Sequence, residues 1–275
     1  MTQAETPAPD WYPDPGGKHE HRYWNGTAWT DDVADHGRQS VDPLAAGHVP
    51  TAGHSAEKVQ QQVQQRAGVQ ATGPGGGTIF TEPIIVVNQK RKLIELNTEF
   101  AVYDQQGNQI GAVRQVGQST AKKALRFVSN VDQFLTHKFQ VVDVQGNVVL
   151  ALTRPAKLVK SKIQIADGQG RPVGEVVQQN AIGKIRFSLE SGGHTLGSIN
   201  AENWRAWNFS IQDHTGTEVA RITKTWEGLA TTLFTTADNF VVQIHRQLDE
   251  PLRSMVVASA LCVDVALKQD SRGLG

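Results

Sequence analysis

"PLRSMVVASALCVDVALK", residues 251–268, is the most apolar stretch of this 275-residue chain. Its core, Met255–Leu267, is shorter than the ~20 residues that a bilayer-spanning helix needs, and it contains Asp264. The stretch is apolar on almost every side, which is untypical of a surface helix. We therefore expect a helix over 252–268 that is buried inside the protein, and a membrane span is the alternative. The predicted core residues of this helix are Met255, Val256, Leu261 and Val265.

A helix without a polar face needs apolar neighbours all round, and the preceding sequence supplies them as a repeat. Its units are "FAVYDQQGNQIGAV" from Phe100, "FQVVDVQGNVVLAL" from Phe139, "IQIADGQGRPVGEV" from Ile163, "FSIQDHTGTEVARI" from Phe209 and the shorter "FSLESGGHTLGSI" from Phe187. In each unit, alternating apolar residues lead to an acidic residue, and a glycine follows three positions later. This pattern predicts a tight turn between two strands.

The second strand of each unit carries apolar residues three positions apart, such as Ile110 and Val113 on either side of Gly111. Strand residues alternate with a period of two, so a spacing of three indicates a bulge at the small residue. Five such hairpins predict an antiparallel meander, and a meander of this size tends to close into a barrel. We expect a mainly β fold, with residues 78–270 forming a barrel around the buried helix.

The N-terminal part differs from the rest of the chain. Residues 8–35 include "WNGTAW", with the Asn-Gly pair of a hairpin turn, and predict a small Trp-rich β module. Residues 36–77 are rich in Ala, Gly, Gln and Pro, which is typical of a flexible linker. Any helix over 55–68 would have few apolar residues and would dock weakly. The module is either a self-packed unit or a docking site for a protein partner, whose candidate residues are Trp11, Tyr12, Tyr23, Trp24 and Trp29.

Charge and cysteine usage limit the possible binding partners and the cellular compartment of the protein. The net charge is zero, with −4 up to Thr78 and +4 from Ile79. This asymmetry is too weak to indicate nucleic-acid binding, but it suits an anionic membrane surface. Cys262 is the only cysteine, which excludes an internal disulfide and favours a reducing compartment. The N-terminal residues lack the pattern of a signal peptide, so we expect a cytoplasmic protein.

Motifs for catalysis are sparse. "GQGRPVG", residues 168–174, joins two predicted strands and lacks the glycine spacing of a nucleotide-binding loop. His19 and His21 lie two positions apart but have no third metal ligand nearby. The sequence therefore predicts a protein that is not an enzyme and holds no metal.

The C-terminal block "TTADNFVVQIHRQLDEPLRSMVVASALCVDVAL", residues 235–267, resembles that of phospholipid scramblases. The Asp-x-x-Gly hairpins resemble those of scramblases and of LURP-one-related proteins. The resemblance covers residues 79–268 and implies the tubby-like fold, a closed 12-stranded antiparallel barrel around one C-terminal helix. "WYPDPGGKHEHRYWNGTAWT", residues 11–30, is similar to a short domain of unknown function common in actinobacterial proteins.

The scramblase resemblance also implies a calcium loop, which would run from residue 236 to residue 247. Asp238 keeps an acidic position there, whereas Thr236 and Gln247 stand where the family has carboxylates. Calcium needs several oxygen ligands, usually including a bidentate carboxylate. We therefore expect an ordinary strand with a turn aspartate, and no cofactor; a weak calcium site at Asp238 and Thr236 is the alternative.

Three local clusters of basic residues are candidates for lipid contact. Each basic residue near an anionic bilayer contributes ~1 kcal/mol to binding. Tubby-like domains are thought to bind phosphoinositides, so the resemblance implies a peripheral protein that binds anionic phospholipid at the cytoplasmic face of the plasma membrane. Transbilayer lipid movement would follow only by analogy of fold. The alternatives are solvated strand edges and a soluble scaffold or regulatory protein. The candidates are Lys90, Arg91, Lys92, Lys122, Lys123, Arg126, Lys157, Lys160 and Lys162.

Overall fold

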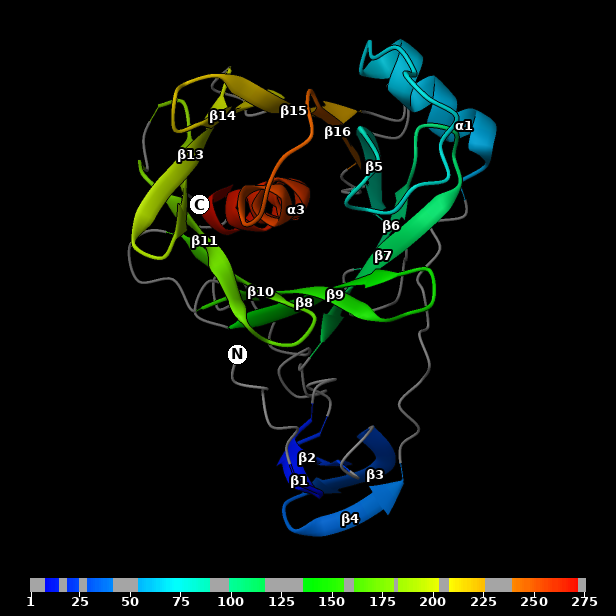
Figure 1. The fold of residues 1–275 in the computed structure, drawn as a ribbon, viewed down its shortest axis with the longest axis vertical. Coiled ribbons are helices and arrows are strands. Elements are labelled where there is room, and N and C mark those ends of the chain that lie inside the picture. The colour runs from blue at the N-terminus through cyan, green and yellow to red at the C-terminus, as the bar shows by residue number, and fades with distance from the viewer. Residues whose placement is uncertain are drawn as a thin grey trace, which may run out of the picture.

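The structure is a computed structural model that describes residues 8–14, 19–24, 29–41, 54–89, 99–116, 136–155, 161–180, 183–202, 208–225 and 239–271. These residues form two β structures, a four-stranded sheet and a closed barrel of twelve strands. Figure 1 looks along the barrel, so that the strands surround a helix seen end-on. A further helical segment lies outside the barrel wall.

The four-stranded sheet contains β1 (Asp10–Pro13), β2 (His21–Trp24), β3 (Trp29–Asp35) and β4 (Arg38–Val41), paired in that order. Val33 is fully buried in it. Arg22 Nε donates to Asp14 Oδ1 at 2.7 Å, and both side chains are almost inaccessible to solvent. A sheet of this size buries little apolar surface, so an internal ion pair forms part of its core.

In the barrel, each strand pairs with its neighbours along the chain, and β16 pairs with β5 to close the ring. All pairs are antiparallel, which confirms the predicted tubby-like, mainly β barrel of about twelve strands. The strands are β5 (Ile84–Gln89), β6 (Glu99–Tyr103), β7 (Gln109–Val116), β8 (His137–Asp143), β9 (Val148–Arg154), β10 (Lys162–Asp167), β11 (Pro172–Gln178), β12 (Arg186–Ser191), β13 (His194–Ala201), β14 (Asn208–Asp213), β15 (Glu218–Thr225) and β16 (Asn239–Ile244).

The Asp-x-x-Gly turns form as the repeat predicts. Asp104 Oδ1 accepts hydrogen bonds at 2.9 Å from the backbone N–H groups of Gln106 and Asn108. Gly107 adopts a φ of 88°, which residues other than glycine rarely adopt. Asp143, Asp167 and Asp213 accept the same pair of backbone bonds in their own turns. The repeated motif therefore encodes the same capped turn in four hairpins.

The predicted bulges are also present. Val102 pairs with Gly111 and Tyr103 pairs with Gln109, so Ile110 is an extra residue on β7. The extra residue shifts the alternation by one, and both apolar residues of the pair can then face the lumen. The equivalent extra residues in the other hairpins are Val149, Val173, Leu196 and Val219. All five belong to the barrel core or pack against it.

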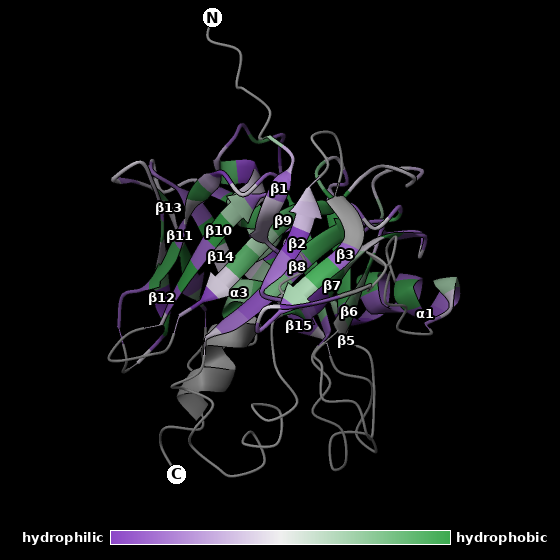
Figure 2. Ribbon diagram, turned by 90° about the horizontal axis from the view of Figure 1, so that it is seen from below, coloured by the Kyte–Doolittle hydropathy of each residue, from purple (hydrophilic) through white to green (hydrophobic). Residues whose placement is uncertain are grey.

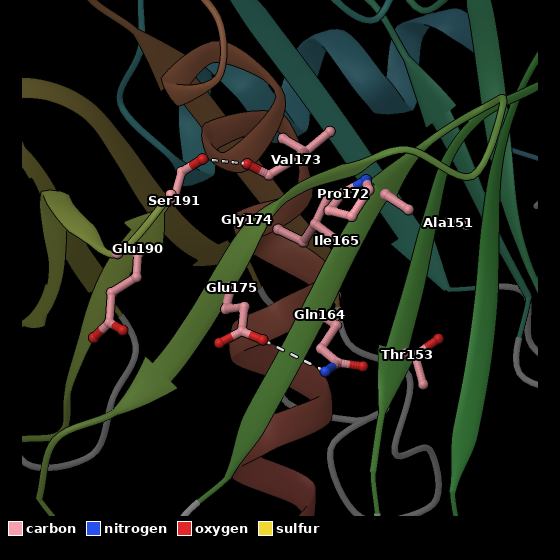
Figure 3. Close-up of a pocket in the computed structure, with 13 residues that line it drawn as sticks. Ala151, Thr153, Gln164, Ile165, Pro172, Val173, Gly174, Glu175, Glu190 and Ser191 are labelled. Atoms are coloured by element: carbon pink, nitrogen blue, oxygen red, sulfur yellow. Dashed lines mark hydrogen bonds between the residues drawn. The ribbon is translucent and has the colours of Figure 1, made fainter.

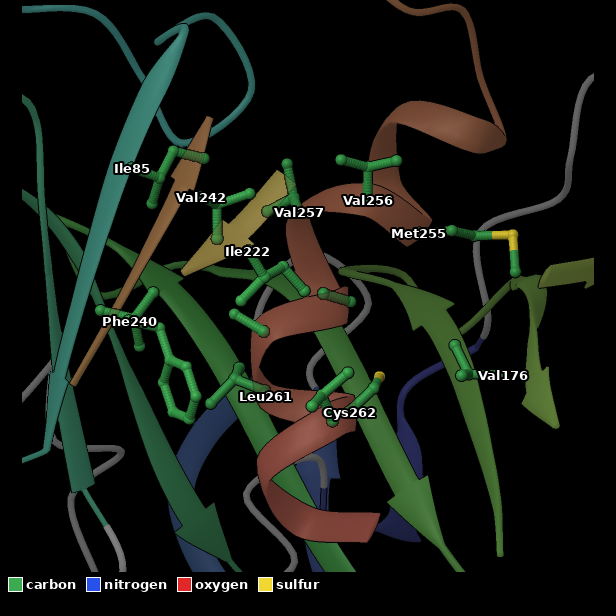
Figure 4. Close-up of a cluster of buried hydrophobic side chains, with 14 of the residues drawn as sticks. Ile85, Val176, Ile222, Phe240, Val242, Met255, Val256, Val257, Leu261 and Cys262 are labelled. Atoms are coloured by element: carbon green, nitrogen blue, oxygen red, sulfur yellow. The ribbon is translucent and has the colours of Figure 1, made fainter. Parts of the chain in front are cut away.

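The C-terminal helix α3 (Leu252–Ser271) runs through the barrel, as predicted. Met255, Val256, Leu261 and Cys262 are 0–4% exposed and pack against strand residues such as Ile222 and Phe240 (Figure 4). The side chain of Val265, predicted to belong to the same core, lies outside the described residues. No helix in the described part of the chain is long and apolar enough to cross a membrane.

Residues 54–77 differ from the predicted flexible linker. Helix α1 (Ala56–Gln61) continues into the π-helical turn η1 (Gln62–Arg66), and this helix packs on the outside of β5, β6 and β16. Val59 and Val63 are fully buried there against Ile84, Val86 and Val241. The expected weak docking is thus wrong, because the barrel presents an apolar patch that these valines cover. The unit boundaries 8–35, 36–77 and 78–270 otherwise stay a prediction.

Candidate functional site

The meander gives the barrel two ends of different character. The tight turns after Tyr103, Asp143, Asp167, Ser191 and Asp213 all lie at one end, which we call the turn end. The longer connections begin after Gln89, Val116, Arg154, Gln178, Ala201 and Thr225, all at the opposite end, which we call the loop end. Figure 2 shows the barrel from the side, with the strands running between the two ends.

Charge is segregated between these ends. Within the described strands and turns, the loop-end half carries seven basic residues and only two acidic ones, Glu99 and Glu202. The turn end carries nine acidic residues and three basic ones, Arg171, Arg246 and Arg253, while Glu175 and Arg221 lie midway along β11 and β15 and belong to neither end. The barrel is therefore an electrostatic dipole along its axis. The basic residues, which together define the basic end, are Arg114, Lys138, Arg154, Lys162, Lys184, Arg186 and Lys224.

Of the nine residues predicted to contact lipid, only Lys162 is described. It begins β10 at the loop end, is exposed, and its Nζ lies 2.5 Å from Glu175 Oε2. The other eight, Lys90, Arg91, Lys92, Lys122, Lys123, Arg126, Lys157 and Lys160, lie outside the described residues. They belong to segments 90–98, 117–135 and 156–160. What the structure describes is the strand before each of these segments, and each such strand ends at the loop end.

Sequence reasoning missed a set of polar side chains inside the wall at the loop end. Gln115, His137 and Arg154 continue the inward-facing positions of β7, β8 and β9, and each is at most 6% exposed. Gln115 Nε2 lies 2.7 Å from His137 Nδ1, close enough for a hydrogen bond. The sequence contained a signal for them. In each of these strands every second residue faces inward and is apolar, except at the loop end, where the inward residue is polar. The lumen is therefore apolar along most of its length and polar near the loop end.

A shallow groove of about 700 Å³ lies on the outer face of β9–β12 (Figure 3). Figure 3 shows Gln164 and Glu175 on the side of the strands facing away from α3. Glu175 pairs directly with Glu190 across β11 and β12, and Gln164 Nε2 donates to Glu175 Oε1 at 3.4 Å. Lys162 pairs with Glu175, and Glu190 adds a further negative charge, so the groove carries no net positive charge to attract a phosphate group.

The turn end is held by a network of ion pairs on the outer face of β14–β16. Glu218 Oε2 accepts from Ser210 Oγ at 2.7 Å and from an Arg221 Nη at 2.9 Å. Asp213 Oδ1 accepts from Thr215 Oγ1 at 2.6 Å, and this bond, with backbone donors and Arg246, lowers the pKa of Asp213 to about 2. These carboxylates already have donors within the fold, which indicates a structural role.

No calcium site can be assigned. Thr236 and Asp238, the two residues that the resemblance offered for calcium, lie outside the described residues. In the part of the chain that the structure describes, no three His, Cys, Asp or Glu side chains come together as metal ligands.

The aromatic residues of the N-terminal sheet are only partly buried. Trp11 and Tyr23 pair across β1 and β2, with ring centroids 5.4 Å apart and planes inclined by 58°. Tyr12 Oη donates to Ala8 O at 2.9 Å, and Trp24 is half-buried. The side chain of Trp29, the fifth candidate, lies outside the described residues. Trp11 and Tyr23 thus form an accessible aromatic pair on one face of the sheet.

Two family profiles match the chain. The profile described as Scramblase matches residues 69–267, which include the barrel and most of α3. The profile of a protein of unknown function, DUF2510, matches residues 9–42 and so covers the four-stranded sheet. Both matches agree with the resemblances drawn from the sequence.

Similar proteins occur in fungi and plants. The chain is 25% identical over 208 residues to altered inheritance rate of mitochondria protein 25 of Saccharomyces cerevisiae, covering 63% of this chain and 62% of the relative. It is 22% identical over 202 residues to a phospholipid scramblase family protein of Schizosaccharomyces pombe, covering 66% of this chain and 52% of the relative. The chain thus spans between half and two thirds of the length of these relatives. An X-ray structure of an Arabidopsis thaliana protein aligns at 16% identity and a TM-score of 0.42, over 70% of this chain and 99% of that one.

Proposed function

Because the chain belongs to the Scramblase family, we propose that it binds anionic phospholipid headgroups at a membrane surface through the basic end of its barrel. In this proposal it acts without catalysing a chemical reaction, as a peripheral protein at the cytoplasmic face of the plasma membrane. Transbilayer movement of the bound lipid is the further activity that the family name suggests.

The observation that supports the proposal best is the segregation of charge along the barrel axis. Anionic lipid attracts the basic end and repels the acidic turn end, so the barrel would approach the membrane end-on. The three predicted lysine and arginine clusters belong to connections at the same end. Several basic residues acting together give appreciable binding, since each contributes about 1 kcal/mol near an anionic surface.

Cosedimentation with vesicles tests this proposal. The full chain is expected to bind vesicles that contain phosphatidylserine and not vesicles of phosphatidylcholine alone. Replacing Lys122, Lys123 and Lys157 by alanine removes three positive charges, and the expected loss is on the order of 100-fold in affinity. Equal binding to both vesicle types would contradict the proposal.

A matched control separates position from net charge. Lys58, Arg171 and Arg246 are exposed and lie at the start of the outer helix or at the turn end, away from the basic end. Their triple alanine variant has the same net charge as the first triple variant, so it should keep most of the binding. If both variants lose affinity equally, the total charge and not the basic end governs binding.

Lipid movement needs its own measurement. In proteoliposomes with a fluorescent phospholipid in one leaflet, we expect the chain to speed the exchange of lipid between leaflets. A rate equal to that of protein-free vesicles would leave headgroup binding as the function and remove transbilayer movement from it.

A second function is favoured by the N-terminal sheet. The accessible Trp11–Tyr23 pair offers apolar area and a polar rim of the kind that protein interfaces use. In this reading the sheet docks a protein partner and the barrel acts as a scaffold. Affinity capture with the full chain and with a Trp11→Ala variant tests it, because a specific partner should be lost with the indole.

A further inference from the structure

The N-terminal sheet carries the charge opposite to that of the basic end. Its described residues include six acidic side chains and two basic ones, Arg22 and Arg38. Arg22 is buried with Asp14, so this pair adds no charge to the surface. Asp10, Glu20 and Asp32 are exposed, which leaves the surface of the sheet negative.

The basic end offers exposed cations on one side of the barrel. Lys138 is the second residue of β8, and Lys162 is the first residue of β10. Arg186 is the first residue of β12, and Lys184 lies two residues before it. All four are exposed. These strands alternate with β9 and β11 around the same arc of the wall. The arc therefore presents a row of positive side chains at the loop end.

We propose that the N-terminal sheet docks onto this row in the same chain and competes with the anionic membrane for it. The proposal rests on the proposed function, because it assigns that site a regulator within the chain. The acidic sheet and an anionic bilayer would bind the same lysine and arginine side chains, so they cannot both be bound at the same time. The protein thus has a closed form, with the sheet on the barrel, and an open form that binds lipid.

The tether is long enough for this contact. Residues 42–53 connect the sheet to the outer helix, and twelve residues span at most about 42 Å when extended. The helix begins at the turn end, where Ala56 lies against Gly107 so closely that a Cβ on that glycine would be 2.5 Å from Ala56 Cα. A strand of six to eight residues covers roughly 20–26 Å. At about 4.8 Å per strand, the row on β8–β12 lies roughly 10–29 Å around the wall from β6. The axial and lateral distances combined stay within the reach of the tether, so the sheet can contact the row from its anchor.

Tethering also makes a weak contact effective. Connection through only twelve residues gives the sheet a local concentration of roughly millimolar order at the barrel surface. Contacts between exposed charges are screened within about 10 Å at 0.1 M salt. The closed form should therefore be populated at low salt and should open when salt or anionic lipid is added.

The first test removes charge from the sheet while keeping its shape. The variant Asp10→Asn/Glu20→Gln is expected to bind phosphatidylserine vesicles at least threefold more tightly than the unmodified chain. The matched control Glu57→Gln/Asp249→Asn makes the same change in net charge at exposed residues of the outer helix and the turn end. The control should change affinity by less than half as much. Equal gains in both variants would show that net charge alone acts and would overturn the docking proposal.

The second test needs no lipid. A zero-length carbodiimide reagent joins a carboxylate to an amine in direct contact, and mass spectrometry identifies the joined residues. We expect links from Asp10 or Glu20 to Lys138, Lys162 or Lys184 at low salt, and their loss at high salt. Absence of these links at low salt refutes the closed form. If the links form but no variant binds vesicles, the docking stands and the proposed lipid function fails.

Discussion

Replacing Leu261 by alanine tests whether α3 stabilises the barrel from inside. Leu261 is 4% exposed and belongs to the barrel core. The change removes three carbon atoms, which at ~0.8 kcal/mol per buried methylene amounts to about 2.4 kcal/mol. The cavity that remains adds to this cost, and measured Leu→Ala losses in protein cores run to about 5 kcal/mol. We expect the free energy of unfolding to fall by about 2–5 kcal/mol.

The assay is urea unfolding followed by circular dichroism. With a slope of about 2–3 kcal/mol/M, the midpoint should fall by about 1–2 M. Val144 is the matched control, because it is 48% exposed and Val144→Ala should change the free energy of unfolding by less than about 0.5 kcal/mol. If Leu261→Ala unfolds at the same midpoint as the unmodified chain, the helix does not stabilise the barrel from within.

Three further outcomes are expected. Val257→Asp places a carboxylate at a 7% exposed core position, and we expect no soluble folded barrel; a cooperative unfolding transition for this variant would contradict the buried helix. Because the Thr215 hydroxyl and other donors lower the pKa of Asp213 from 3.8 to about 2, its contribution to stability is complete above pH 4 and is lost as the pH falls through 2. Thermal unfolding should therefore show that Asp213→Asn lowers stability at neutral pH and that this difference narrows between pH 4 and pH 2; a constant difference would be inconsistent with that pKa. Gln62 donates to Asn88 Oδ1 at 2.8 Å in a buried contact, so Gln62→Leu should cost about 1–3 kcal/mol and speed hydrogen exchange in η1; unchanged exchange would show that this contact does not hold the helix.

The hairpins could be predicted from the sequence because their determinants are local. An aspartate binds the amides two and four residues later, and a glycine three residues later takes a positive φ, so the turn needs no distant partner. The bulges follow from apolar residues three apart. The buried helix is also local in origin, since a stretch without a polar face requires apolar surroundings.

The docking of the outer helix was mispredicted for a physical reason. Val59 and Val63 look too few to anchor a helix, and their partners lie more than 20 residues away. The overlooked signal was "IIVV", residues 84–87. This part of the strand is apolar on both faces, although only one face is turned to the lumen. The outward residues of this strand needed a cover, which the helix provides.

The candidate site, like the fold, could be predicted from the sequence only in part. The basic clusters are visible in the sequence, where they lie far apart and could equally be solvated strand edges. Closure of the barrel assigns their connections to one end, because every second strand of an antiparallel ring points the same way. The alternation of each strand points Gln115, His137 and Arg154 inward, but the register between β7, β8 and β9 decides that they become neighbours.

The sequence by itself determined the turns, the bulges, the alternation of each strand and the burial of the C-terminal helix. Each of these depends on the chemistry of a few neighbouring residues. Only the tertiary structure decided the segregation of charge between the two ends, the gathering of polar side chains inside the loop end and the packing of the outer helix on β5, β6 and β16. Those features depend on which distant strands become neighbours, and strand pairing is fixed by burial over the whole chain rather than by any single segment.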